Sequence, residues 1–204
     1  QYPGKNLWMF SGFTFEELNT PGHHANCPET AEILSMLDVL VDGRFVLAQL
    51  QQHGSDTSRV RVSTTAPTGF SDVMSLPTGE RTFFHMRGAN DEFCPEDAEL
   101  SGLGCLILHI GYLMLLARFD APDAEYGTGM ARFRHDVQAQ GIKTSVDAVS
   151  NSTADYGAVA RPALRWCNYL IINEIECCGI WDIAPRLPDG TLDVAAVERA
   201  MRLC

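Results

Sequence analysis

The chain is short of positive charge. It has 15 Lys and Arg residues against 26 Asp and Glu, which gives a formal net charge of −11. Sequence-independent nucleic-acid binding relies on Lys and Arg to neutralise phosphates, so this balance argues against a nucleic-acid partner. Long apolar runs are also missing: no stretch approaches the roughly 20 apolar residues of a membrane span, and the first residues lack a secretory pattern. We therefore expect a cytoplasmic protein without a membrane partner.

The cysteines form no recognisable metal-binding motif. The spacing matches neither a Cys-x-x-Cys pair nor the three-cysteine loop of iron–sulfur clusters. Free cysteines in apolar surroundings behave as small hydrophobic residues, so reduced structural thiols are the expectation. The seven cysteines lie at positions 27, 94, 105, 167, 177, 178 and 204.

Short apolar segments alternate with helical patterns in the second half of the chain. Strands are expected at 105–110, 143–146 and 169–172, and helices at 122–140, 156–164, from 173 onward and at 193–203. Such alternation is typical of βαβ units with a parallel sheet, and right-handed crossovers place helices on both faces. The sequence therefore predicts a three-layer α/β fold.

Ligands of such sheets sit beyond the carboxyl ends of the strands. This rule draws attention to residues 109–112, to Asp147 and to residues 173–176. Asn173 and Glu176 are one helical turn apart, so both can face one ligand, and amide and carboxylate oxygens can hold Mg²⁺ through water. Alternatively, Asn173 is an N-cap with a first-turn Glu, and Asp147 is a turn or cap residue.

Residues 68–90 read as a β-hairpin. Two extended runs, 68–76 and 81–86, flank a turn that contains Pro77 and Gly79. His85 and Arg87 alternate along the second run, so their side chains share a face and can hydrogen-bond hydroxyls or a carboxylate of a ligand. The alternative is a solvent-facing strand. Asn90, in the following Gly-Ala-Asn corner, either contacts the same ligand or fixes the backbone.

The hairpin sequence GERTFFHMRGAN (79–90) and the preceding GRFVLAQLQQHGSDTSRV (43–60) resemble the ribokinase-like (PfkB) carbohydrate kinases. The resemblance covers about residues 42–204. It implies a three-layer ribokinase-like sheet with a small β lid at about 60–90. It also implies ATP-dependent phosphoryl transfer to a sugar hydroxyl, and a homodimer through the lid.

The same resemblance assigns roles to the candidate residues. Asn173 and Glu176 match the family's Asn-x-x-Glu motif, which implies that Glu176 holds Mg²⁺ through water. Asp147 and Asn173 would lie near the phosphates of ATP. The lid residues His85, Arg87 and Asn90 would contact a sugar or sugar acid, so ATP and Mg²⁺ are the expected cofactors.

The chain departs from the family pattern in two places. No Arg follows Asp147 at the family's Asp-x-Asn-x-Arg spacing, and the Gly-Ala-Gly-Asp motif that supplies the catalytic base occurs nowhere in the 204 residues. Without this base, we assign no catalytic residue and predict an incomplete, inactive sugar kinase. The alternative is a non-catalytic binding or dimerisation module of the same fold.

The first 46 residues resemble a different family. LWMFSGFTFEEL (7–18) and DVLVDGRFV (38–46) are similar to the later part of anaerobic ribonucleotide reductase activating proteins, which are radical S-adenosylmethionine enzymes with an iron–sulfur cluster. The two resemblances meet at residues 41–46 and suggest a chimera of an activase-like βαβ segment (1–46) and a partial sugar kinase domain (47–204). Because Cys27 alone cannot replace the three-cysteine loop, no iron–sulfur cluster is expected. A radical-enzyme activator is thus the least favoured function.

Overall fold

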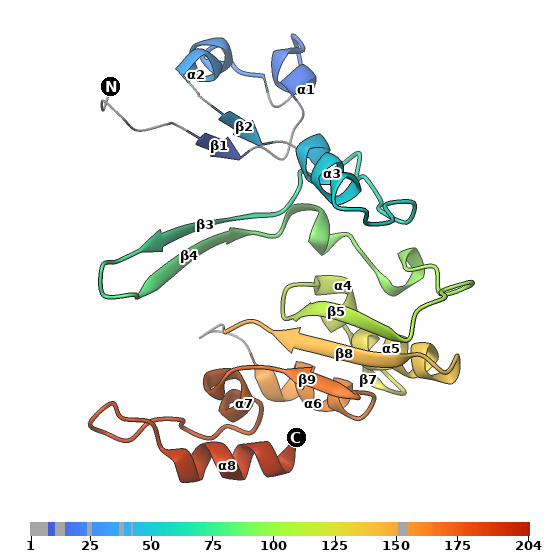
Figure 1. The fold of residues 1–204 in the computed structure, drawn as a ribbon, viewed down its shortest axis with the longest axis vertical. Coiled ribbons are helices and arrows are strands. Elements are labelled where there is room, and N and C mark those ends of the chain that lie inside the picture. Colours follow the sequence, from blue (N-terminus) through green and yellow to red (C-terminus); the bar gives the residue numbers. More distant parts are fainter. Residues whose placement is uncertain (1–7, 11–14, 24–25, 37–38, 42, 151–154) are drawn as a thin grey trace. The chain divides into compact units, whose positions relative to one another are not determined.

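The computed structural model describes residues 8–10, 15–23, 26–36, 39–41, 43–150 and 155–204. The chain divides into two compact units, Gln1–Asn90 and Asp91–Cys204 (Figure 1). This division reflects compactness and does not test the proposed boundary at residue 46, which stays a prediction. Across the described residues, no helix is both long and apolar enough to cross a membrane.

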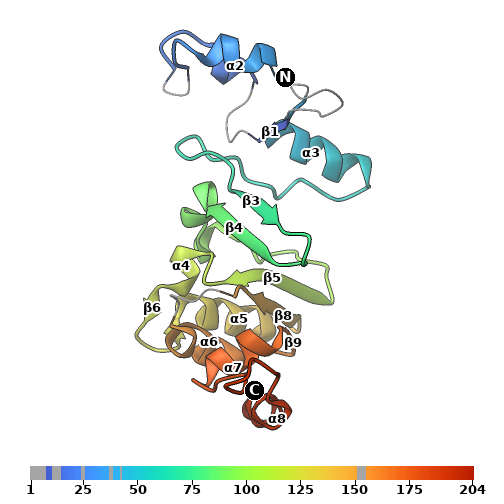
Figure 2. The ribbon, with the colours of Figure 1, turned by 90° about the vertical axis from the view of Figure 1, so that its left-hand side faces the viewer.

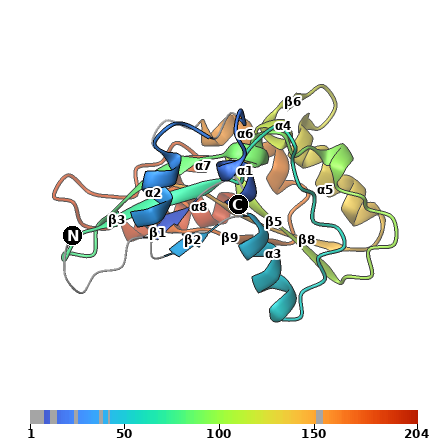
Figure 3. The same ribbon diagram turned by 90° about the horizontal axis from the view of Figure 1, so that it is seen from above.

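The N-terminal unit begins with a short βαβ arrangement. Its two strands pair in parallel, with Trp8 opposite Val39. A longer helix follows and ends at Gln52 (Figure 3). Two residues later Gly54 has a φ of +76°, as expected for a glycine after a helix. Thr14, which the sequence predicts as the N-cap of the first helix, lies outside the described residues. The elements are β1 (Trp8–Phe10), α1 (Phe15–Asn19), α2 (Thr30–Met36), β2 (Val39–Val41) and α3 (Gly43–Gln52).

The predicted hairpin is confirmed. Strands β3 (Phe70–Ser75) and β4 (Arg81–Met86) are antiparallel, and the register runs from Phe70 opposite Met86 to Ser75 opposite Arg81. A corner follows at Gly88, which has a φ of +54°. A Cβ at this position would lie 2.2 Å from the carbonyl oxygen of Pro67, so the close approach of the two segments requires glycine.

The C-terminal unit is built on a parallel sheet with the strand order β5-β8-β9 (Figure 2). This arrangement confirms the predicted α/β class. The elements after a 3-10 turn at Pro95–Asp97 are β5 (Ile107–Leu113), α4 (Ala117–Asp120), β6 (Pro122–Asp123), β7 (Gly127–Thr128), α5 (Gly129–Ala139), β8 (Lys143–Ala148), α6 (Tyr156–Leu164), β9 (Tyr169–Ile171), α7 (Glu174–Ile180) and α8 (Val194–Leu203).

Helix α5 is shorter than the sequence pattern predicts. The helix expected from residue 122 starts only at Gly129, after the small hairpin β6–β7. The Asp123 carboxylate accepts hydrogen bonds from the amides of Glu125 and Tyr126, which closes the turn. Thr128 then caps α5 by accepting from the amide of Ala131. Local side-chain bonds to the backbone therefore outcompete the helix here.

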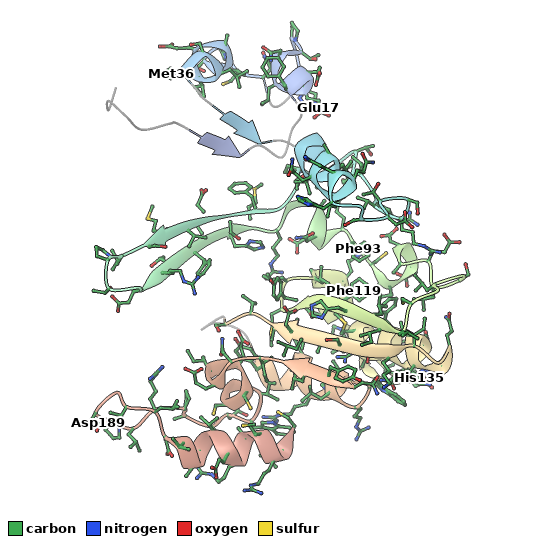
Figure 4. The ribbon with its side chains drawn as sticks, viewed as in Figure 1. Glu17, Met36, Phe93, Phe119, His135 and Asp189 are labelled. Atoms are coloured by element: carbon green, nitrogen blue, oxygen red, sulfur yellow. The ribbon has the colours of Figure 1, made fainter. Side chains whose placement is uncertain are left out.

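The core of this unit lies on one face of the sheet. Ile110 and Val146 point into a cluster with Phe119 and Phe133, and Figure 4 shows Phe119 together with Phe93 in this region. Helices α5 and α6 add Met130, Val137, Tyr156, Ala160 and Ala163 to the cluster. The alternate residues of the sheet lie on the opposite face, where the exposed apolar side chains are Ile107, Tyr169 and Ile171.

Candidate functional site

The segment between β9 and α7 forms a closed hydrogen-bond network. Asn173 is the N-cap of α7, and its side-chain oxygen accepts from the amides of Ile175 and Glu176, both at 2.9 Å. In return, the Glu176 carboxylate accepts from the Asn173 amide at 3.0 Å. This reciprocal pair is a capping box. The capping box holds Asn173 and Glu176 side by side. This geometry is compatible with both roles predicted from the sequence, the helix cap and the ligand site.

Ser150 adds a contact from the loop after β8. Its hydroxyl donates to Oε1 of Glu176 at 2.7 Å, and the Asn173 side-chain amide donates to the same oxygen at 2.9 Å. The Glu176 residue is only 6% exposed. A buried carboxylate is stable only when donors surround it, and these two side chains together with the Asn173 backbone supply them.

Asp147 lies near this network, as the next-to-last residue of β8. Burial raises the pKa of its carboxyl group, His109 opposes this effect, and the charge of Glu176 raises the pKa further. The Nε2 atom of His109 is 3.6 Å from Oδ1 of Asp147. A Cβ at Gly111 would lie 2.8 Å from the same oxygen, so glycine at 111 leaves room for the carboxylate. Asp147 in β8 and Glu176 in the first turn of α7 thus both lie at the carboxyl end of the sheet.

Two residues of this region were not singled out as individual site residues by sequence reasoning. His109 lies in the range selected by the strand-end rule, and its Nδ1 atom is 3.1 Å from the hydroxyl of Ser145. The parallel register, which places His109 opposite Ser145, is what brings them together. No sequence pattern indicated Ser150, because its hydrogen bond to Glu176 joins two residues that are 26 positions apart.

The three candidate residues of the hairpin belong to the N-terminal unit. The His85 Nδ1 atom is 2.8 Å from the hydroxyl of Ser71, its cross-strand neighbour. Strand β4 ends at Met86, so Arg87 lies in the following corner, where its carbonyl oxygen accepts from the amide of Asn90. The structure therefore brings Arg87 and Asn90 together, and the ligand roles of all three residues stay predictions.

Comparison with known proteins gives two separate similarities. The model of a family described as "4Fe-4S single cluster domain" matches residues 1–63. A search among curated proteins gave no match. The second similarity is to solved structures and covers most of the chain.

Three of these structures have TM-scores above 0.5. A ribokinase from Giardia lamblia is 16% identical with a TM-score of 0.57, over 78% of this chain and 44% of its own. A fructokinase from Xylella fastidiosa is 19% identical with a TM-score of 0.54, over 79% and 48%. The protein Sa239 is 15% identical with a TM-score of 0.57, over 84% and 53%. The chain thus spans about half the length of these structures and has the ribokinase-like fold.

The family match corrects the cofactor prediction. The expectation that the chain has no iron–sulfur cluster is wrong, because residues 1–63 match a cluster domain. That expectation relied on counting thiolates, and Cys27 is the only cysteine in this range. Within the described ranges, no three His, Cys, Asp or Glu side chains gather as a metal site, so these residues do not by themselves fit a cluster.

Proposed function

We propose that this chain is part of a carbohydrate kinase-like protein and binds ATP with Mg²⁺ at the carboxylates of Asp147 and Glu176. The observation that carries this proposal is the placement of both residues at the carboxyl end of the parallel sheet, where ligands of α/β folds bind. Burial raises the pKa of Asp147, and the charge of Glu176 adds a smaller effect in the same direction. A bound divalent cation would offset both effects.

The proposed roles follow from the chemistry of each side chain. Glu176 would hold Mg²⁺ through water, and Asp147 and Asn173 would lie near the phosphates. Mg²⁺ keeps several water ligands and takes others from phosphate oxygens, so two carboxylates are enough from the protein. At the hairpin, His85, Arg87 and Asn90 would donate hydrogen bonds to the hydroxyls or carboxylate of a sugar or sugar acid.

Binding is the activity that we propose for this chain, and phosphoryl transfer is a property of the fold's kinases. Transfer to a sugar hydroxyl needs a positioned base, and no Gly-Ala-Gly-Asp motif occurs in the sequence. We expect negligible ATP-dependent phosphorylation of sugars by the 204-residue chain. The match of residues 1–63 to a cluster domain supports an iron–sulfur-related origin for that segment, different from that of the kinase-like part. The proposed ATP binding does not involve a cluster.

Replacing Glu176 by Gln tests the nucleotide site. Gln at this position preserves the capping box but removes the negative charge. We expect the affinity for ATP in the presence of Mg²⁺ to fall at least about tenfold, as is typical when a group that supports a metal is lost. Isothermal titration calorimetry measures this change directly.

The matched control is Glu198→Gln on the exposed surface of α8, which should bind ATP like the unmodified protein. Equal affinity of Glu176→Gln and Glu198→Gln would contradict the role of Glu176. An unmodified protein that binds no ATP with Mg²⁺ would refute the site as a whole.

A second candidate function is dimerisation through the hairpin. Val73 and Phe83 are cross-strand neighbours on one face of it, and both are about half exposed. The other face presents Met74 and Phe84, which are also exposed. A two-stranded ribbon with apolar side chains on both faces is marginal in water, and pairing with a second copy would cover it.

We expect the unmodified protein to be a dimer in light scattering, and Phe83→Lys to be a monomer. A lysine in the centre of an apolar contact would have to lose its hydration shell. Thr78→Lys in the turn of the hairpin is the control and should remain dimeric. A monomeric unmodified protein would exclude this function.

A further inference from the structure

We infer that Cys177 and Cys204 are a redox-active thiol pair that forms a disulfide by exchange with a low-molecular-weight disulfide such as oxidised glutathione. The two Sγ atoms are 3.9 Å apart, although 27 positions separate the residues. Cys177 lies in the middle of α7, and Cys204 directly follows α8. All seven cysteines are free thiols in the structure, so the pair is described in its reduced state.

Helix packing brings the two thiols together. Helices α7 and α8 form a small apolar cluster of their own, in which Cys177 and Ala200 are buried. The backbone amide of Cys204 donates to the carbonyl of Ala200 at 3.2 Å, so Cys204 extends the last turn of α8. The position of its sulfur atom is therefore set by the helix and does not depend on a loop.

The environment of Cys204 suits the attacking thiol. This residue is exposed, whereas Cys177 is only 5% exposed. The indole N–H of Trp181 points at Cys204 Sγ from 3.2 Å. An N–H donor stabilises a thiolate, which is the reactive form of cysteine in exchange reactions.

A cavity gives a reagent access to both sulfur atoms. It has a volume of about 280 Å³, and both cysteines line it. The rest of the lining is mostly apolar, with one amide and one carboxylate: Leu170, Ile172, Asn173, Glu174, Val197 and Met201.

The exchange proceeds in two balanced steps. The Cys204 thiolate attacks one sulfur of the small disulfide, a mixed disulfide forms, and one thiolate leaves. Burial and the neighbouring Cys204 raise the pKa of Cys177 to about 12, so this thiol reacts second and more slowly. It gives its proton to solvent and attacks Sγ of Cys204, which expels the second thiolate. Overall, two cysteine thiols are oxidised by two electrons, and one small disulfide is reduced to two thiols.

The adjacent cysteine does not offer the same chemistry. Cys178 is fully buried, and adjacent residues of a helix point in different directions. Cys27 is exposed like Cys204 but belongs to the N-terminal unit, so it is a useful reference thiol.

The test is to incubate the full chain with oxidised glutathione and to map the disulfides by tandem mass spectrometry. We expect Cys177 joined to Cys204, a loss of two hydrogens from the intact mass, and reversal by dithiothreitol. The cross-link closes a long loop, so the Tm of the oxidised protein should exceed that of the reduced protein. Cys204→Ser should abolish both the link and the Tm shift, while Cys27→Ser should change neither.

Recovery of Cys204 as a stable mixed disulfide with glutathione, or joined to a different cysteine, would overturn the inference. So would a Tm shift on oxidation that is equal in Cys204→Ser and the unmodified protein. Cys204 and Cys27 are both exposed, so neither substitution disturbs the core. A difference between the two variants therefore reports on the thiols and not on a loss of packing.

Discussion

Phe119→Ala should lower the free energy of unfolding by about 3–5 kcal/mol, the usual cost of truncating a buried Phe. Phe119 is 1% exposed, and its ring lies 5.2 Å from that of Phe133 in an edge-to-face arrangement and 5.4 Å from that of Phe93. The substitution would leave a cavity between these two rings and also remove both aromatic contacts. Urea denaturation, followed by circular dichroism, measures the loss.

The control for this prediction is Leu106→Ala, just before β5 of the same unit. Leu106 is 86% exposed, so its truncation should change the stability by no more than about 0.5 kcal/mol. Similar losses for the two variants would mean that Phe119 does not occupy the core of the C-terminal unit.

Arg134→Met should raise the free energy of unfolding, by about 1–4 kcal/mol. Arg134 is fully buried in α5, and among the described residues its Nε and Nη1 atoms have no hydrogen-bond partner. Burial lowers the pKa of this guanidinium, and Cys167 counteracts the effect. Met has a similar length and no charge, so it fills the space without the cost of removing a cation from water.

The contact of Arg134 with Thr144 can be lost without leaving the Thr144 hydroxyl unpaired. Its Nη2 atom donates to the Thr144 hydroxyl at 3.2 Å, but Thr144 also accepts from Gln138 and donates to the carbonyl of Trp166. Arg132→Met on a different face of α5 is the matched control. The Arg132 side chain is 43% exposed and pairs with Asp123. That variant should gain no stability, and a destabilised Arg134→Met would show that the buried cation is needed for the fold.

The fold class could be predicted because its signals are local. Helix α6 has the predicted bounds, since Asp155 caps it and the apolar periodicity continues to Leu164. Strand β9 was located from the apolar run 169–172, and β8 from its place just after Gly141, which ends the preceding helix. The hairpin β6–β7 was missed because its turn depends on the Asp123 side chain and on Gly127, which packs against Pro162 of α6.

The candidate site was predictable only in part. Asn173 and Glu176 are close in sequence, so their spacing indicates a shared helix terminus. The contacts of Ser150 with Glu176 and of His109 with Asp147 depend on the order and register of the strands, which local patterns do not specify. The pair Cys177 and Cys204 was missed for the same reason, because helix packing across 27 positions creates it.

The hairpin has a further consequence for assembly. Among the described residues its sheet contains only β3 and β4, so each strand has one outer edge with backbone groups directed away from its partner. Pairing of β4 with β4 of a second copy, about a two-fold axis, closes after two chains. Pairing of β3 with β4 of the next copy is head-to-tail, and it adds chains without limit unless the rotation between copies closes a ring. The choice of edge therefore decides between a finite particle and a fibre.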